Sequence, residues 1–308
     1  MVTRVSFGPS LQNTWTTAYD TNLIRAPFFT YQWHVLWYEV LAKDWQPYPL
    51  VIDETIIAPF ARKANEIIFS GGEEISDYQD IIGSDKHKFD ACKQIVDFLK
   101  GDGVTSIRLR NVPQSSATVS FFQSLANATV TQEDTTPIIR LPATWDEYIA
   151  SLPYKNRHEL RRKIRKIERE HKHIALINSH NPQQDIEILL DLMRKDKKKA
   201  TFLTAEMTTF FQKLPEVFPE DISLLTLMME DKPAAATLSF IANNGVLLYN
   251  SGFDKQCCPN AGWYLKAMTV KKAIEQERTQ YNFLQGSERY KYNFGGTDFF
   301  VYSITVNL

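Results

Sequence analysis

Apolar residues recur along this chain at two spacings, which predict helices and strands in alternation. Residues 28–44 place their apolar side chains on one face at a period of 3.6, the pattern of an amphipathic helix. Short apolar runs that end in turn residues predict strands. This alternation favours a mixed α/β layer structure. The remaining elements predicted before the middle of the chain are strands at 50–52, 55–60, 67–69, 104–109 and near 130, and helices at 86–99, 116–127 and 144–150.

The strands predicted in the second half lead into the segment that carries most of the candidate chemistry. Three apolar runs, at 224–229, 235–241 and 246–249, are separated by short turns and predict antiparallel strands. The third ends at Ser251-Gly252, and a polar loop precedes a helix that begins near Gly262. Free N–H groups at a helix start can hold a phosphate, and a glycine lets it come close. The alternative is an ordinary strand-to-helix turn in which Gly262 serves packing.

A second motif closes this segment. After a short apolar run at 281–284, residues Gly286 to Phe294 read GSERYKYNF. This block resembles the carboxyl-terminal part of the GNAT-type acyltransferases grouped with the CelD/BcsL proteins, whose closing motif is G-x-E-x-Y-K-x-x-F. Those proteins are similar in architecture to the Fem-type peptidyltransferases, which carry two GNAT-like domains in one chain. Residues 71–80 and 141–170 resemble the family's amino-half signature and its connecting basic helix.

The resemblance implies an α/β fold of two tandem GNAT-like domains, with mixed, largely antiparallel central sheets flanked by helices. A polar linker at 131–137 predicts the boundary between them. Residues 1–135 then form an N-terminal GNAT-like domain on the acceptor side. Residues 136–308 form the C-terminal GNAT acyltransferase domain on the donor side, which includes a basic helix at 155–173.

Candidate contacts to an acceptor or a polyanion come from both halves. The family counterpart of the loop that holds Asp77 and Tyr78 helps to shape the acceptor cleft, although Asp77 also suits a cap or turn. The segment Lys155–His173 holds nine Lys and Arg against three Glu, a net charge of +6, with one narrow apolar stripe. Its cationic face, with Arg161 and Arg165, is either a solvated surface or a site for coenzyme phosphates, an acidic acceptor or RNA.

Acyl transfer to an amine needs stabilisation of a developing oxyanion and a route for protons. An amine of pKa about 10.4 is mostly protonated at pH 7, so freeing it costs roughly 4 to 5 kcal/mol. The resemblance puts Lys291 near the reacting carbonyl. Asp254 and Glu288 are the candidate proton acceptors, and Tyr249 and Tyr290 are the candidate donors to the leaving sulfur. The alternatives are a surface ion pair between Lys291 and Glu288, and tyrosines that are simply buried in the sheet.

Composition narrows the class of protein. A length of 308 residues suits two domains of about 150 residues each. The formal charge of -1 leaves any attraction to anions to local patches. The amino terminus lacks the pattern of a secretory signal and no apolar stretch is long enough to span a membrane, so a cytoplasmic location is expected.

The three cysteines predict neither a disulfide framework nor a zinc site, because their number is odd and no paired CxxC spacing occurs. Cys92 is expected in a core. The adjacent pair Cys257-Cys258 is either a plain loop or a redox or acyl-accepting site. Phosphate-loop, HExxH and GxSxG motifs are also missing from the sequence, and no metal is expected.

We therefore expect an N-acyltransferase that moves an acyl group from acyl-CoA, either acetyl-CoA or a longer one, directly to a small-molecule or peptide amine. The predicted coenzyme-binding residues are Asn260, Ala261, Gly262, Trp263 and Arg289. One alternative is a Fem-type transferase that uses aminoacyl-tRNA, with tRNA bound by the basic helix. The other is a non-catalytic module that binds polyanions on an acyltransferase scaffold.

Overall fold

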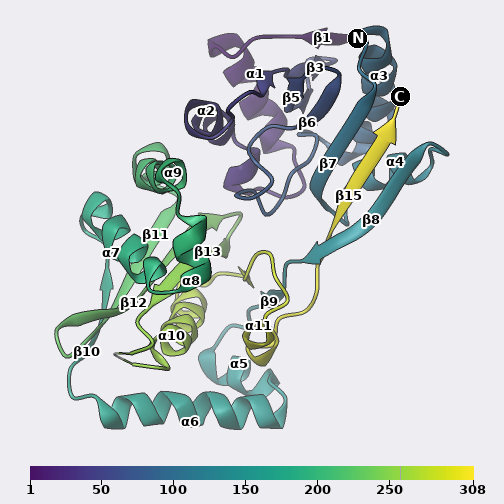
Figure 1. The fold of residues 1–308 in the computed structure, drawn as a ribbon. Helices are drawn as coiled ribbons and strands as arrows, with labels where there is room; N and C mark the ends of the chain where they lie inside the picture. The colour runs from purple at the N-terminus through teal and green to yellow at the C-terminus, as the bar shows by residue number, and fades with distance from the viewer. Residues whose placement is uncertain (257) are drawn as a thin grey trace. The chain divides into compact units, whose positions relative to one another are not determined.

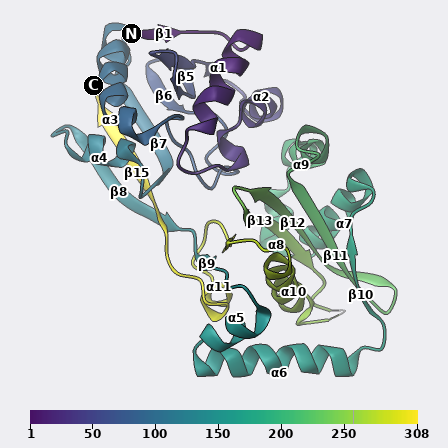
Figure 2. The same cartoon turned by 180° about the vertical axis from the view of Figure 1, so that it is seen from behind.

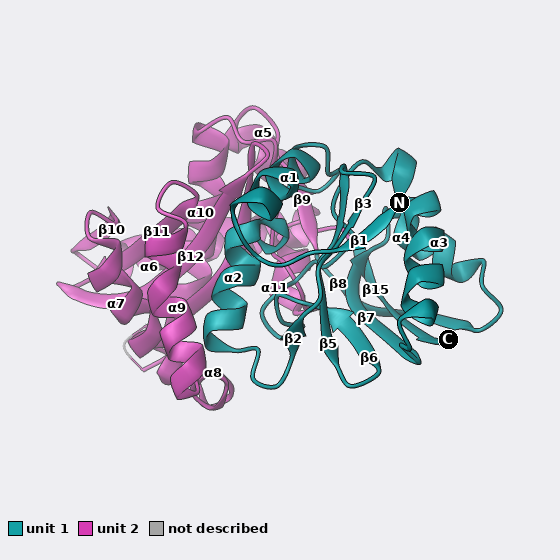
Figure 3. Ribbon diagram, turned by 90° about the horizontal axis from the view of Figure 1, so that it is seen from above, with its two compact units in different colours: residues 1–136, 299–308 teal, residues 137–298 magenta. Residues whose placement is uncertain are grey.

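The computed structural model describes residues 1–256 and 258–308, which form two compact units. Unit 1 contains Met1–Thr136 together with Phe299–Leu308, and unit 2 contains Pro137–Asp298 (Figure 3). Unit 2 is therefore inserted in the sequence of unit 1. The prediction that residues 299–308 belong to the second domain was wrong, because this segment forms a strand in the main sheet of unit 1.

Unit 1 has two sheets. Its larger sheet has the strand order β2-β5-β6-β7-β15-β8, in which only β6 and β7 run parallel, and its smaller sheet has the order β1-β3-β4. The strands are β1 (Val2–Arg4), β2 (Gln46–Pro47), β3 (Leu50–Ile52), β4 (Ile56–Ala58), β5 (Phe60–Lys63), β6 (Glu66–Phe69), β7 (Ser106–Pro113), β8 (Ala128–Thr135) and β15 (Phe300–Asn307). The helices are α1 (Pro9–Asp20), the 3-10 helix η1 (Pro27–Phe29), α2 (Tyr31–Val40), α3 (Asp85–Gly101) and α4 (Ala117–Gln123).

Strand β15 explains the error in the predicted linker. It pairs with β7 on one side and with β8 on the other, and Val301, Ile304 and Val306 on it are fully buried. Residues 131–135 of the predicted linker lie in β8, which is an edge strand. An edge strand with one wetted face tolerates polar residues, so this stretch reads as a linker although it is paired.

Unit 2 is built on one six-stranded sheet with the order β10-β11-β12-β13-β14-β9, in which only β13 and β14 run parallel (Figure 1). Its strands are β9 (Ile138–Arg140), β10 (Ile174–Asn178), β11 (Ile222–Met229), β12 (Lys232–Ala242), β13 (Gly245–Phe253) and β14 (Gln280–Asn282). Its helices are α5 (Trp145–Ser151), α6 (Tyr154–Glu170), α7 (Pro182–Arg194), α8 (Lys197–Phe202), α9 (Ala205–Val217), α10 (Ala261–Glu275) and α11 (Arg289–Asn293). The predicted antiparallel strands β11, β12 and β13, and the helix that follows them, are confirmed.

Helices α7 and α10 cover opposite faces of this sheet (Figure 2). At Gly252 of β13 an added Cβ would lie 2.5 Å from the backbone nitrogen of Met193 on α7. At Gly262 on α10 an added Cβ would lie 2.7 Å from the ring of Phe253, the next residue along β13. Successive strand residues point to opposite faces, so the two contacts define the two sides of the sheet. The side of Phe253 is the one that carries the candidate chemistry.

Candidate functional site

The candidate site of unit 2 begins where β13 and β14 separate. These parallel strands pair only between residues 245–247 and 280–282. The register between β12 and β13 shifts at Tyr249, just after that pairing stops, because Leu238 faces Asn250 while Ser239 faces Leu248. Bulges of this kind redirect a strand and are frequent next to active sites. The edge of β13 that faces β14 therefore has no strand partner from residue 248 onward among the described residues.

Three lysine side chains from three elements lie at this edge, and we call Lys199, Lys266 and Lys291 the lysine cluster. Lys199 is on α8 and donates to the backbone oxygen of Ser251. Lys266 is on α10 and donates to the hydroxyl of the same serine over 3.1 Å. Lys291 is on α11, and its charge acts on both of the other lysines.

Lys291 is buried, with 2% of the residue exposed, and its ammonium group is fully occupied. Its Nζ donates to the carbonyl oxygens of Leu284 (2.9 Å), Gln285 and Gly286 (3.0 Å) and lies 2.9 Å from Oε2 of Glu288. Three protons already have four acceptors, so none is left for a substrate. Lys291 holds together the loop between β14 and α11, and the ion pair with Glu288 that was the alternative interpretation is present.

Lys266 has a different environment. Only 6% of the residue is exposed, and its two hydrogen-bond acceptors are the Ser251 hydroxyl and, at 3.4 Å, the carbonyl oxygen of Gly262. Its ammonium group also lies 5.1 Å from the centre of the Tyr290 ring. Burial, and after it the positive charge of Lys199, lowers the pKa of Lys266 to about 7. At neutral pH this amine is therefore divided between its charged and neutral forms.

Glu288 and Tyr290 complete the wall of the cluster. The side chain of Glu288 is 59% exposed and faces solvent. Burial raises the pKa of Tyr290, and the carboxylate of Glu288 raises it further, so the hydroxyl keeps its proton at neutral pH. The roles of Tyr290 as a proton donor and of Glu288 as a proton acceptor therefore stay predictions.

The other two candidate catalytic residues have structural partners. Asp254 pairs with Lys195, and its second carboxylate oxygen accepts the N–H of Gln256 at 2.9 Å. These contacts fix the loop after β13. The ring of Tyr249 stacks on Phe211 with centroids 5.7 Å apart and also touches Phe240. The geometry favours the alternative interpretation for Tyr249, a tyrosine packed in the sheet.

The start of α10 is packed rather than open, which corrects the prediction of a phosphate site at Gly262. The missing Cβ of Gly262 makes room for the ring of Phe253. Ala261 is fully buried and its N–H is bonded to the carbonyl oxygen of Cys258. Asn260 is the N-cap residue, although its side chain makes no capping hydrogen bond. Close packing of the helix on the strand accounts for this stretch.

A pocket of about 350 Å³ lies next to this helix start, and two predicted coenzyme residues, Trp263 and Arg289, line it. We call it the basic pocket. Its other lining residues are Lys155, Asn156, Glu159, Lys163 and Asn293. The ammonium group of Lys163 lies 4.6 Å from the centre of the Trp263 ring, and the indole N–H of Trp263 is buried with no hydrogen-bond partner among the described residues. Three cations and one acid make the pocket suitable for an anion.

The basic helix has the predicted character. Leu160 and Ile167 of α6 are buried, and the arginines on the outer face are exposed. Arg161 and Arg165 take part in no salt bridge within the described chain, whereas Arg162 is paired with Glu159 at 2.7 Å. The outer face is thus positively charged and open to solvent.

In unit 1 the structure corrects one of the acceptor candidates. Tyr78 is 1% exposed, and its hydroxyl donates to the Thr136 hydroxyl at 2.6 Å. Its side chain belongs to the interior of unit 1 and does not face a ligand. Asp77 is half-buried in the same loop.

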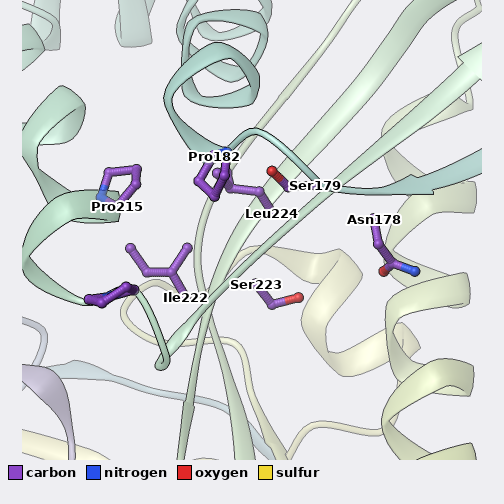
Figure 4. A pocket seen from close by; sticks show the side chains of 8 residues that line it. Asn178, Ser179, Pro182, Pro215, Ile222, Ser223 and Leu224 are labelled. Atoms are coloured by element: carbon purple, nitrogen blue, oxygen red, sulfur yellow. The ribbon is translucent and has the colours of Figure 1, made fainter.

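Two further features lie away from the lysine cluster. Cys92 is in the core of unit 1 as predicted, and Cys258 is buried in unit 2 with its sulfur 3.6 Å from Nε2 of His171, while Cys257 lies outside the described residues. A pocket of about 270 Å³ near the end of β10 is lined by Asn178, Ser179, three prolines and residues 222–224 (Figure 4). It contains no ionisable side chain, so it offers no acid–base chemistry.

Over the described ranges, no group of three or more His, Cys, Asp or Glu side chains is arranged to hold a metal ion. The helices within those same ranges are all too short or too polar to cross a bilayer.

Lys199 and Lys266 were missed at the level of sequence. The sequence did contain an indication that Lys266 is unusual, because it is the one charged residue in the otherwise uncharged stretch Ala261–Val270. A lone charge at a buried helix position calls for a partner or a function. The sequence contained no such indication for Lys199, because this residue ends a run of three lysines that is typical of a solvated surface.

Comparison with known protein families identifies the region that carries the lysine cluster. Residues 154–292 match the family described as the acetyltransferase (GNAT) domain. These residues therefore resemble a GNAT domain. The matched region holds the gap between β13 and β14, the lysine cluster and all but one strand of the sheet in unit 2.

Three solved structures resemble the whole chain. A conserved protein of unknown function from Bacteroides thetaiotaomicron has a TM-score of 0.66 and 11% sequence identity, and 100% of each chain is covered. FemX has a TM-score of 0.66 and 10% identity, with 100% of this chain and 97% of that chain covered. A tandem GNAT protein from the clavulanic acid biosynthesis pathway has a TM-score of 0.53 and 9% identity, with 99% and 97% covered. None of the curated proteins matches this chain.

Identities this low establish the fold alone, and the predicted tandem GNAT-like fold with largely antiparallel sheets is confirmed. The match to the GNAT family model supports the prediction of an acyltransferase.

Proposed function

We propose that unit 2 transfers an acyl group from acyl-CoA to the amine of a small molecule or peptide by direct attack. The observation that carries this proposal is the lysine cluster beside the unpaired edge of β13, in a region that resembles a GNAT domain. The positive charges of Lys199 and Lys291, next to an open strand edge, can help to stabilise the negative charge that develops on the thioester oxygen during attack. The closing motif Gly286–Phe294 supports kinship with the CelD/BcsL proteins, and a cytoplasmic location remains part of the proposal.

The basic pocket is the proposed anchor for the phosphate groups of the coenzyme. Its volume of about 350 Å³ suits a phosphorylated fragment rather than a whole coenzyme. Lys155, Lys163 and Arg289 supply positive charge, and the side chain of Trp263 forms part of the pocket wall. Trp263 precedes Lys266 by three residues, about one turn of α10, so an anchored coenzyme has only a short distance to reach the lysine cluster.

Calorimetric titration with acetyl-CoA and a longer acyl-CoA tests this proposal. Each of the substitutions Lys163→Gln and Arg289→Gln should weaken binding about tenfold, because a lost charge-assisted hydrogen bond costs about 1.5 kcal/mol or more. The matched control is Arg161→Gln, an exposed cation outside the pocket, which should leave binding unchanged. No binding of either acyl-CoA by the intact protein would overturn the proposal.

A Fem-type reaction with aminoacyl-tRNA is the second candidate, favoured by the exposed cations of α6 and by the similarity of fold to FemX. In this case the variants on the outer face of α6, and not those in the basic pocket, should weaken binding of the donor. Arg161→Gln and Arg165→Gln should weaken tRNA binding and lower its dependence on salt concentration, since each removes about one phosphate contact. Binding of acyl-CoA without any tRNA shift at low salt would favour the first candidate.

A further inference from the structure

We propose that Lys266 is the residue that takes the proton from the acceptor amine during acyl transfer. This inference rests on the proposed function and goes beyond it by naming the base. It replaces Asp254 and Glu288, the two carboxylates expected from the sequence, with an amine on α10. The position of Lys266, its hydrogen bonds and the charges that surround it carry the argument.

The position of Lys266 is the first step. Its side chain reaches from α10 to Ser251 on the unpaired edge of β13, where the nitrogen lies 3.1 Å from the serine hydroxyl. Of its two acceptors, only the hydroxyl is at a normal hydrogen-bond distance, because Gly262 is 3.4 Å away. The neutral amine then has a lone pair available to take a proton.

The charges around Lys266 are the second step. Lys199 on α8 and Lys291 on α11 oppose its protonation, and Glu288 favours it. Ser251 on β13 and the ring of Tyr290, also on α11, carry no charge at neutral pH. Burial of Lys266 is the largest cause of its lowered pKa, and with two cations against one well-hydrated carboxylate it leaves the neutral amine populated at neutral pH, which a base requires.

The competing carboxylates are less suitable. Asp254 has one oxygen paired with Lys195 and the other accepting a backbone N–H. One oxygen of Glu288 is paired with Lys291. Lys291 cannot act as the base either, since its nitrogen donates to three carbonyl oxygens and has no free lone pair.

In the proposed reaction the proton lost by the acceptor amine ends on the leaving sulfur, by way of Lys266. The acceptor nitrogen attacks the carbonyl carbon of the thioester and a C–N bond forms. A proton on that nitrogen moves to Nζ of Lys266, the C–S bond breaks, and the thiolate leaves. The ammonium group of Lys266 then returns the proton to the sulfur, so that the products are an amide and a free thiol and the enzyme is regenerated. Nothing is oxidised or reduced.

Substitution of Lys266 by arginine and by methionine provides the test. Arginine keeps the positive charge but cannot release a proton, so Lys266→Arg should lower kcat at least about 100-fold while acyl-CoA still binds. Lys266→Met should lose activity to the same extent. A Lys266→Arg enzyme with nearly full kcat would overturn the proposal, because a cation alone would then suffice.

A second measurement leaves Lys266 itself unchanged. Removal of the neighbouring cation by Lys199→Met should raise the pKa of Lys266, so the acid limb of the profile of kcat/KM against pH should move to higher pH with the same acceptor. Lys199 is a positioning residue in this scheme, and a purely structural role would lower activity without moving the limb. An unshifted limb would contradict the proposal.

Nuclear magnetic resonance of lysine labelled at the ε-carbon gives a readout that does not depend on activity. The Lys266 signal, assigned through its loss in Lys266→Met, should titrate near pH 7 in the wild-type protein, and titration near pH 10 would overturn the inference. If the wild-type protein neither binds nor transfers any acyl group, the proposed function fails first. If it does both while Lys266→Arg remains active, only the inference fails.

Discussion

Lys266 and Lys291 are both buried, yet their surroundings compensate the two ammonium groups very differently. Lys291 has three carbonyl oxygens and a carboxylate, whereas Lys266 has a hydroxyl and one distant carbonyl oxygen. A buried charge without good partners destabilises a fold, whereas removal of a well-partnered charge leaves its acceptors unsatisfied. The two lysines should therefore respond in opposite directions to the same substitution.

We predict that Lys266→Met stabilises the protein at pH 7 by about 1–4 kcal/mol, and that Lys291→Met destabilises it by at least about 2 kcal/mol. Unfolding in urea, followed by circular dichroism, measures both changes. Each variant is the control for the other, because both lose one buried ammonium group. Equal effects in the same direction would show that the difference in hydrogen bonding does not matter.

The gain from Lys266→Met should also depend on pH. The pKa of Lys266 in the folded protein, about 7, lies below its ordinary value of 10.5. Between these values the unfolded chain binds more protons than the folded protein, so wild-type stability rises with pH. The penalty is complete below about pH 7 and disappears as pH approaches 10.5, where the advantage of methionine should fade.

At the scale of elements, the close approach of β13 to α7 depends on Gly252. An added Cβ there would lie 2.5 Å from Met193 N and 2.7 Å from the carbonyl carbon of Leu192, both backbone atoms that cannot move without shifting the helix. We predict that Gly252→Ala lowers the free energy of unfolding by about 1–3 kcal/mol or more. Gly101 is the comparison, because a Cβ added there would meet no other part of the protein within 4 Å beyond its own helix backbone and chain neighbours. Gly101→Ala should instead raise the free energy of unfolding by about 0.4–1 kcal/mol. Urea unfolding of the two variants measures the contrast, and a neutral Gly252→Ala would refute it.

The sequence predicted elements well where the local pattern was strong. The strands that became β11, β12 and β13 have long apolar runs separated by short turns, and all three strands appear as expected. The site was predicted less well, because Lys266 and Lys199 meet only through the packing of α8 and α10 on β13. Gly262 shows the same limit, since a glycine that admits a phosphate and one that admits a phenylalanine ring look alike in sequence.

At the scale of the whole molecule, the return of the chain into unit 1 could not be read from local patterns. Strand β15 has the alternating pattern of any half-buried strand, and this pattern does not indicate which strands it pairs with. Pairing with β7 joins residues about two hundred positions apart, such as Asn307 and Ser106. Contacts of such long range are set by the complete fold.

We predict that Ile304→Ala destabilises the protein by about 2–5 kcal/mol, since this side chain is fully buried in the core of unit 1. Hydrogen exchange should then speed up first in β7 and β8, the two strands that pair with β15. The neighbouring change Thr305→Ala, at an exposed position, should alter little. Faster exchange only in unit 2 would be inconsistent with this placement of β15.

The inserted position of unit 2 also bears on how the protein is made. A growing polypeptide leaves the ribosome from its amino end. The larger sheet of unit 1 therefore lacks β15, the strand between β7 and β8, until residues 137–298 have been synthesised. During that interval β7 exposes an unsatisfied edge, which is prone to aggregation. A nascent chain stalled before β15 should therefore depend on chaperones far more than the finished one, even though all of unit 2 has already been synthesised.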